Sequence, residues 1–143
     1  MSRIKSLSFL LMLFLVIASA STALAAAKTF HANGKLESET FYNLQSKAKE
    51  KALWYDQNGL LQAEEKFSSD TSKVVTFYNE KGQKKTEETI ADGKRVRVRA
   101  FHPNGNVMVD YTLKDEKLDG KFTEYREDGK ISKEIDYKDG KEI

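Results

Sequence analysis

Residues 122–131 read FTEYREDGKI: an aromatic residue, Tyr125, stands four positions before Gly129, and an apolar residue, Ile131, stands two positions after it. The same arrangement recurs around four earlier glycines, and successive glycines are 25, 23, 23 and 24 residues apart. The glycines are Gly34, Gly59, Gly82, Gly105 and Gly129, the aromatic residues are Phe30, Tyr55, Tyr78, Phe101 and Tyr125, and the residues two positions after the glycines are Leu36, Leu61, Lys84, Val107 and Ile131. A fixed period of this length with a fixed internal pattern indicates a repeat array, in which one small supersecondary unit is stacked along an axis.

Each glycine closes a tetrad with the composition of a tight turn. Asn-Gly or Asp-Gly ends four of the five tetrads, and Pro103 stands at the second turn position, where its fixed φ is favourable. This composition predicts a hairpin turn of type I whose last residue is left-handed, a conformation that glycine reaches without steric cost. In such a hairpin the aromatic residue pairs with the apolar residue two positions after the glycine, so Phe30 faces Leu36 and Tyr125 faces Ile131.

The segments between the turns have the length and the alternation of short β-strands. Strands are predicted over residues 83–91, 94–102, 106–113, 120–126 and 130–138. Apolar residues also stand eight positions after each glycine, at Tyr42, Phe67, Ile90, Leu113 and Tyr137. Strict alternation would put them on the same face as the residues two positions after the glycine. The sequence predicts an all-β fold: an elongated antiparallel β-meander of nine or ten short strands, built of about five repeated β-hairpins in one sheet.

The first 25 residues have a different character. A short basic start precedes an unbroken apolar run of ten residues, and Ala23 and Ala25 occupy the two positions that a signal peptidase reads. This order predicts a signal peptide over residues 1–25, cleaved after Ala25, and one repeat domain over residues 26–143. Because the apolar run is too short to span a bilayer, we expect an exported protein, periplasmic or secreted, that meets the membrane only transiently through its signal peptide.

The composition excludes several classes of partner and chemistry. The signal peptide carries two of the 24 basic residues and none of the 22 acidic ones, so the remaining chain has 22 of each and a formal net charge of zero. A neutral chain lacks the basic excess that attracts nucleic acid or anionic lipid. With no cysteine, the chain has neither thiol chemistry nor cysteine metal sites. We therefore expect no nucleic-acid partner.

An acidic residue stands five positions after every glycine, at Glu39, Glu64, Glu87, Asp110 and Glu134. One carboxylate per repeat, on strands about 9.5 Å apart, cannot supply the roughly six to eight oxygens that calcium prefers. The favoured interpretation is structural, with each carboxylate paired to a neighbouring Lys or Arg on a solvated face. His31 and His102, at the first turn position, are expected to cap their turns. We expect no catalytic residue, no metal and no cofactor, and hence a protein that is not an enzyme.

A second set of apolar residues lies at odd offsets from the glycines, on the first strand of repeats two to five. It consists of Ala52, Trp54, Val75, Phe77, Val98, Ala100 and Phe122. Alternation places this strip opposite the main apolar face and beside the acidic row. One interpretation is a second small core, covered by the stems of Lys and Glu side chains; the other is an exposed groove for a partner. The candidate partner-binding residues are Trp54, Val75, Phe77, Val98 and Phe122.

The repeat unit resembles the bacterial variant of the MORN repeat, as found in YwqK-family antitoxin-like proteins. The best-matching unit reads Lys117-Leu118-Asp119-Gly120-Lys121-Phe122-Thr123-Glu124-Tyr125-Arg126-Glu127-Asp128-Gly129-Lys130-Ile131 and continues to Tyr137-Lys138-Asp139-Gly140-Lys141. The resemblance extends over residues 28–143. It implies a sheet of hairpins whose surface binds or scaffolds other proteins, and its antitoxin link implies neutralisation of a partner toxin by protein–protein contact.

The leading interpretation is an exported, non-enzymatic protein–protein interaction module, and the resemblance implies an antitoxin-like or immunity-like role for it. An alternative is a cell-wall or carbohydrate-binding repeat protein, because residues 54–59, WYDQNG, look like one unit of a wall-binding repeat. The positions equivalent to Trp54 are Thr29, Phe77, Ala100 and Glu124, so an aromatic stacking position is not repeated in every unit. Self-association through a sheet edge, such as the one near residues 138–143, is a further expectation.

Overall fold

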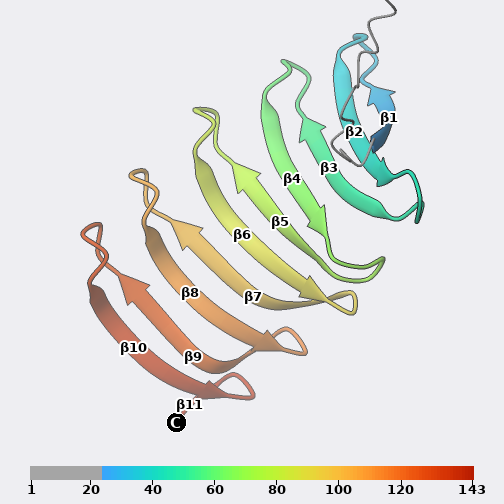
Figure 1. Cartoon of the computed structure of the whole chain (residues 1–143). Helices are drawn as coiled ribbons and strands as arrows, with labels where there is room; N and C mark the ends of the chain where they lie inside the picture. Colours follow the sequence, from blue (N-terminus) through green and yellow to red (C-terminus); the bar gives the residue numbers. More distant parts are fainter. Residues whose placement is uncertain (1–23) are drawn as a thin grey trace, which may run out of the picture.

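The computed structural model describes residues 24–143, which form one layer of eleven antiparallel β-strands (Figure 1). The strands are β1 Leu24–Phe30, β2 Leu36–Asn43, β3 Lys49–Tyr55, β4 Leu61–Phe67, β5 Lys73–Tyr78, β6 Lys84–Ala91, β7 Lys94–Phe101, β8 Val107–Lys114, β9 Lys117–Tyr125, β10 Ile131–Lys138 and β11 Lys141–Glu142. Their order in the sheet is their order in the chain, so each strand pairs only with its sequence neighbours. The predicted all-β meander of hairpins is confirmed.

The predicted signal peptide lies almost entirely outside the described residues. Ala23 is outside them, whereas Ala25 lies in β1, opposite Tyr42 of β2. Cleavage after Ala25 would keep the part of β1 that begins at Ala26, so export stays a prediction that is compatible with the first hairpin. Over residues 24–143 there is no helix that is long and apolar enough to cross a bilayer.

The five glycine turns have the predicted geometry. Each of these glycines has a φ between 73° and 90°, and its N–H donates to the carbonyl oxygen of the first turn residue at 2.9 Å. The turns set the register that the sequence predicts, since Phe30 pairs with Leu36 and Tyr125 pairs with Ile131. Because the turn fixes which residues face each other, the pairing near each glycine follows from the tetrad alone.

Two-residue turns close the opposite edge of the sheet in the last three repeats. They are Asp92-Gly93, Asp115-Glu116 and Asp139-Gly140, and both residues of each turn have positive φ values. Positive φ at both positions is the signature of the type I′ turn, whose twist matches that of the flanking strands. Glu116, with a φ of 62°, is the residue in these turns whose side chain is least suited to that conformation.

A β-bulge follows every glycine turn. In the second hairpin Tyr55 pairs with Leu61, but Trp54 pairs with Ala63, so Gln62 is an extra residue in β4. The equivalent extra residues in the other hairpins are Glu37, Lys85, Met108 and Ser132. One extra residue inverts the alternation of the strand beyond it, so residues on the two sides of the bulge exchange faces.

The bulges correct two of the sequence-based predictions. Glu64 pairs with Leu53 of β3. Since Leu53 and Trp54 are adjacent in β3 and point to opposite faces, Glu64 lies on the face opposite Trp54. Phe67 lies on the same face as Trp54. The predictions that residues two and eight positions after a glycine share a face, and that the apolar strip lies beside the acidic row, are therefore both wrong. We call the face with Glu39, Glu64, Glu87, Asp110 and Glu134 the carboxylate face, and the face with Ala52, Trp54, Val75, Phe77, Val98, Ala100 and Phe122 the strip face.

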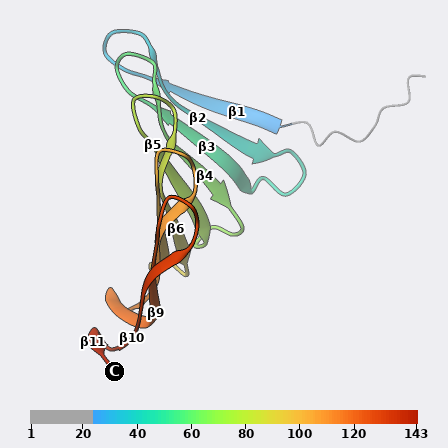
Figure 2. The same ribbon diagram turned by 90° about the vertical axis from the view of Figure 1, so that its left-hand side faces the viewer.

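The core of this single layer is thin and consists of small side chains. Figure 2 shows the sheet from its side, twisted along its length, with no other element of the described chain against either face. The buried residues are Ala52, Ala63, Val75 and Val98 on the strip face, together with Ser38, Thr76 and Thr123. Ile131 is 52% exposed, so the Tyr125–Ile131 pair lies at the rim of the sheet and not in its core.

Candidate functional site

Each of the five acidic residues that define the carboxylate face forms an ion pair. These residues form one cross-strand row, and each contacts a basic side chain from a neighbouring strand or from its own. The pairs are Lys28–Glu39, Lys51–Glu64, Arg99–Glu87, Arg97–Asp110 and Lys121–Glu134. No cluster of His, Asp and Glu among residues 24–143 could hold a metal ion. The structural interpretation of the acidic row is confirmed, and this face offers a partner a surface whose charges are already neutralised.

Two carboxylates of this row have lowered pKa values. Burial raises the pKa of Glu64, but hydrogen bonds from Lys51 and from the Tyr78 hydroxyl outweigh it, so the net shift is downward. For Glu87 the same burial effect is outweighed by Arg99 and Lys84, and the pKa is again lowered. Both groups are therefore ionised at neutral pH and stabilise the fold in that form.

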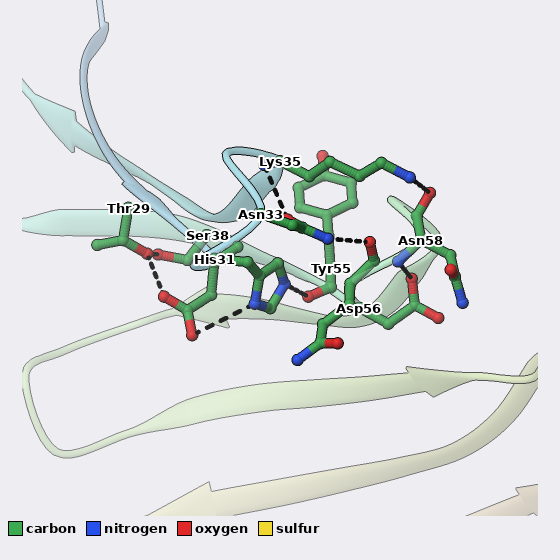
Figure 3. A network of polar contacts seen from close by, with 10 residues as sticks. Thr29, His31, Asn33, Lys35, Ser38, Tyr55, Asp56 and Asn58 are labelled. Atoms are coloured by element: carbon green, nitrogen blue, oxygen red, sulfur yellow. Dashed lines mark hydrogen bonds and ion pairs between the residues drawn. The ribbon is translucent and has the colours of Figure 1, made fainter.

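Side chains of the first glycine turn are hydrogen-bonded to the second turn along one edge of the sheet (Figure 3). His31 donates through its Nε2–H to the Tyr55 carbonyl oxygen at 2.9 Å, and Asn33 donates through its Nδ2 to the Gln57 carbonyl at 2.9 Å. The ammonium group of Lys35 donates to the carbonyl oxygen of Asn58 at 3.2 Å. Each of these bonds connects the first turn to the second.

The fourth and fifth turns are linked in the same way, because His102 donates to the Tyr125 carbonyl at 2.8 Å. The prediction that His31 and His102 cap their own turns is therefore wrong. That role belongs to residues such as Asp56, whose Oδ1 accepts the N–H of Asn58 at 2.8 Å. The histidine positions hold neighbouring hairpins together, which is a structural role.

The strip face carries the candidate site, and its side chains form two parallel rows across the strands. The first row, from β3 to β8, is Trp54, Ala63, Phe77, Thr86, Ala100 and Val109. The second row, from β3 to β9, is Ala52, Glu65, Val75, Glu88, Val98, Tyr111 and Phe122. All five sequence-predicted binding residues lie in these two rows.

The five candidate residues differ in accessibility. Trp54 is 42% and Phe77 is 37% exposed, and each is the second-last residue of its strand, beside a bulge. Val75 and Val98 are 8% and 5% exposed and form the floor between their larger neighbours. Phe122 is half-buried. Trp54 and Phe77 are therefore the residues that a partner can contact directly, while the two valines support the surface.

Tyr111 and Tyr137 are aromatic residues of the strip face that were not among the predicted site residues. Tyr111 stacks on Phe122 with ring centroids 5.8 Å apart, and Tyr137 meets the edge of Phe122 at 6.2 Å. Sequence alternation assigned Tyr137 to the other face because it ignored the bulge. The signal that could have revealed the bulge is the residue three positions after the glycine, which is polar or charged in four of the five repeats.

The two carboxylates in the second row of the strip face are paired within the chain. Lys73 contacts Glu65 at 2.6 Å, and Arg95 contacts Glu88 at 3.4 Å. The ammonium group of Lys73 also lies 5.5 Å from the ring centroid of Phe67, within the range of a cation–π contact. Because both carboxylates of the second row have a basic partner on the same face, a molecule that covers this face need not supply counter-charges.

A single layer of hairpins with one ion-paired face and one partly apolar face defines a β-hairpin repeat array. The family model of the MORN repeat variant matches residues 25–44 and residues 118–139, which correspond to the first and last hairpins. These two hairpins are therefore similar to the MORN repeat variant, and the hairpins between them repeat their geometry. No curated protein matches the chain.

Among solved structures, the chain is similar to a crystal structure of a mutant of S. aureus TarM in complex with Fondaparinux, alpha-GlcNAc-glycerol and UDP. The two are 12% identical in sequence, with a TM-score of 0.47. The alignment covers 82% of this chain but only 21% of that one, so the chain spans about a fifth of the length of its structural neighbour.

Proposed function

We propose that this chain is an exported, non-enzymatic MORN-repeat module that binds another protein through the strip face. The observation that carries the proposal is the exposure of Trp54 and Phe77 on the strip face, beside the bulges at the glycine-turn ends of β3 and β5 and on either side of the buried Ala63. Covering apolar surface contributes about 25 cal/mol per Å², and a tryptophan and a phenylalanine side by side can anchor a protein interface.

Two further observations support the choice of face. The carboxylate face is occupied by ion pairs between neighbouring strands, so its charges already have partners within the chain. The strip face combines exposed aromatic side chains with a small-residue floor and paired charges. MORN-repeat modules commonly mediate protein interactions, which fits a surface of this kind.

The antitoxin-like form of the proposal specifies the partner as a toxin that acts outside the cytoplasm. In that form the strip face covers an apolar surface of the toxin and blocks it by contact. A carbohydrate ligand is the competing form, and it requires a flat aromatic ring that is free to stack on a sugar. Trp54 serves both forms, so the experiment has to include a protein arm and a glycan arm.

The test uses the protein that begins at Ala26, with Trp54→Ala and Phe77→Ala as variants. Ile131→Ala is the matched control, because Ile131 is an equally exposed apolar residue on the carboxylate face. A partner captured from an envelope extract is identified, purified and titrated against each protein. We expect each strip-face variant to weaken binding by about tenfold or more and the control to change it little.

Trp54 is the only tryptophan of the chain, so its fluorescence reports directly on the surface. On binding of the purified partner, its emission is expected to shift to shorter wavelength as water leaves the ring. Equal binding by the wild type and both strip-face variants would refute the proposal. A spectral shift on addition of cell-wall glycan, with no protein binding, would favour the carbohydrate form instead.

A further inference from the structure

Bulky side chains change rows halfway along the strip face. In the first row they stand on β3 and β5, as Trp54 and Phe77, whereas β7 and β8 carry Ala100 and Val109. The second row has the reverse order. There the small residues stand on β2 and β3, as Thr40 and Ala52, and the bulky residues stand on β8 and β9, as Tyr111 and Phe122. The change occurs between β5 and β6, in the middle of the sheet (Figure 1).

We infer that the strip face is covered by a second copy of this chain, in a two-fold symmetric sandwich of two sheets. This inference rests on the proposed function and specifies its partner. The two-fold axis runs between the sheets, parallel to the strands, at the boundary between β5 and β6. It therefore places β5 of one copy over β6 of the other, and in the same way β3 over β8 and β2 over β9.

This operation places a large side chain over a small one at four contacts of the two rows, whereas Ala63 of β4 lies over Ala100 of β7. In the first row, Trp54 lies over Val109 of the other copy and Phe77 lies over its Thr86. In the second row, Tyr111 lies over Ala52 and Phe122 over Thr40. Two sheets that pack face to face are about 10 Å apart. A pair of large side chains would hold them apart and a pair of small ones would leave a void, so alternating sizes fill the layer.

The same operation puts polar residues at the ends of the first row. Glu124 of β9 lies over Ser38 of β2, which gives the patch a polar rim around its apolar centre. Inside the patch, Glu65 and Glu88 keep the partners Lys73 and Arg95 of their own chain. The sandwich therefore covers these two carboxylates together with their basic neighbours and leaves Glu124 at its rim.

The size of the patch is that of a stable interface. The eight strands from β2 to β9 span about 38 Å at about 4.8 Å per strand. The two rows, together with the adjoining row of Phe67, Lys73, Ile90 and Arg95, span about 20 Å along the strands. The product is about 760 Å² on each copy, close to the roughly 800 Å² per partner of a standard protein–protein interface. An array with one neutral, partly apolar face of this size has a sufficient partner in a second copy of itself.

The test exchanges the large and small residues of one contact. Trp54→Val removes the large side chain, and Val109→Trp places tryptophan over tryptophan in the sandwich. The double variant Trp54→Val with Val109→Trp restores one large and one small residue at each of the two symmetric contacts. Molar mass is measured by light scattering and sedimentation on the protein that begins at Ala26, and circular dichroism establishes that each variant is folded.

The expected result is a dimer for the wild type, a dimer dissociation constant raised at least about tenfold for Val109→Trp, and recovery to within about threefold in the double variant. If a Val109 variant does not fold, the pair Phe77→Thr and Thr86→Phe gives the same test one contact nearer the axis. Ile131→Trp, on the carboxylate face, is the control and leaves the dimer unchanged.

Two results would overturn the inference. The first is a monomeric wild-type protein at concentrations up to about 100 μM, far above the dissociation constant that an interface of this size commonly gives. The second is a dimer that Val109→Trp leaves intact, which would place the contact at a sheet edge. Loss of partner capture by Trp54→Ala in a monomeric protein would preserve the proposed function and reject only the second copy as partner.

Discussion

Replacing Gly120 with alanine is expected to reduce the free energy of unfolding by about 2–4 kcal/mol. Gly120 lies inside β9 with a φ of 100°, a conformation that alanine rarely adopts. Such a backbone costs about 1–3 kcal/mol for a residue with a Cβ. A Cβ at this position would also lie 2.6 Å from Oγ1 of Thr112. Thr112 would have to turn away and lose its 2.5 Å hydrogen bond to the Asp119 carbonyl, which adds about 1 kcal/mol.

Gly59→Ala is the matched control. Gly59 has a φ of 90°, and nothing lies within 4 Å of the Cβ that alanine would add. It therefore carries the backbone strain without the steric contact. The two variants and the wild type are compared by urea denaturation, and the two losses of stability are expected to differ by about 1 kcal/mol. Equal slopes of the three transitions show that the comparison concerns stability alone.

A double-mutant cycle with Thr112→Ala isolates the contact itself. In the Gly120→Ala background, removing the threonine hydroxyl is expected to relieve the clash, so the two substitutions together cost less than the sum of their separate effects. The reasoning is refuted if Gly120→Ala costs no more than Gly59→Ala, or if the two substitutions in the cycle are additive.

Three further outcomes are expected. Intact-mass measurement of the exported protein gives a chain that starts at Ala26, and a chain that retains Met1 would contradict the predicted cleavage. Stability falls as the pH is lowered from about 5 to about 2, because the folded-state pKa values of Glu64 and Glu87 are lowered and the stabilisation that exists above the unfolded-state pKa is lost as these groups protonate. Glu87→Gln reduces this pH dependence, and an unchanged profile of the urea midpoint against pH would argue against the ion pair with Arg99. Val98→Ala costs about 2 kcal/mol because this side chain is buried, whereas Tyr125→Ala costs about 1 kcal/mol because its partner Ile131 is exposed. Urea midpoints in the reverse order would mean that the rim, and not the strip face, holds the core.

The parts of the fold that follow from local chemistry were predictable. The tetrad that ends in Gly129 specifies a turn, and the turn fixes the pairing of Tyr125 with Ile131, so the hairpins and their register could be read from the sequence. The spacing of the five glycines then specified the number of hairpins. Each of these steps needs only residues that are a few positions apart in the chain.

The assignment of faces could not be predicted in the same way. A bulge adds one residue without changing the spacing of the glycines, so Phe67 moves to the face of Trp54 while the repeat period stays the same. The role of His31 depended on the distance to a carbonyl group in the next repeat, which no local pattern reports. The candidate residues themselves were found, because Trp54 and Phe77 stand on the same side of their strands before the bulge intervenes.

The order of the strands in the sheet has a consequence for how this array can change in evolution. Because every strand pairs only with its sequence neighbours, a duplication or deletion of one whole hairpin breaks and remakes a single junction between strands. The remaining hairpins keep their turns, their bulges and their ion pairs. The length of the binding surface can therefore grow or shrink in steps of one repeat without the invention of a new core.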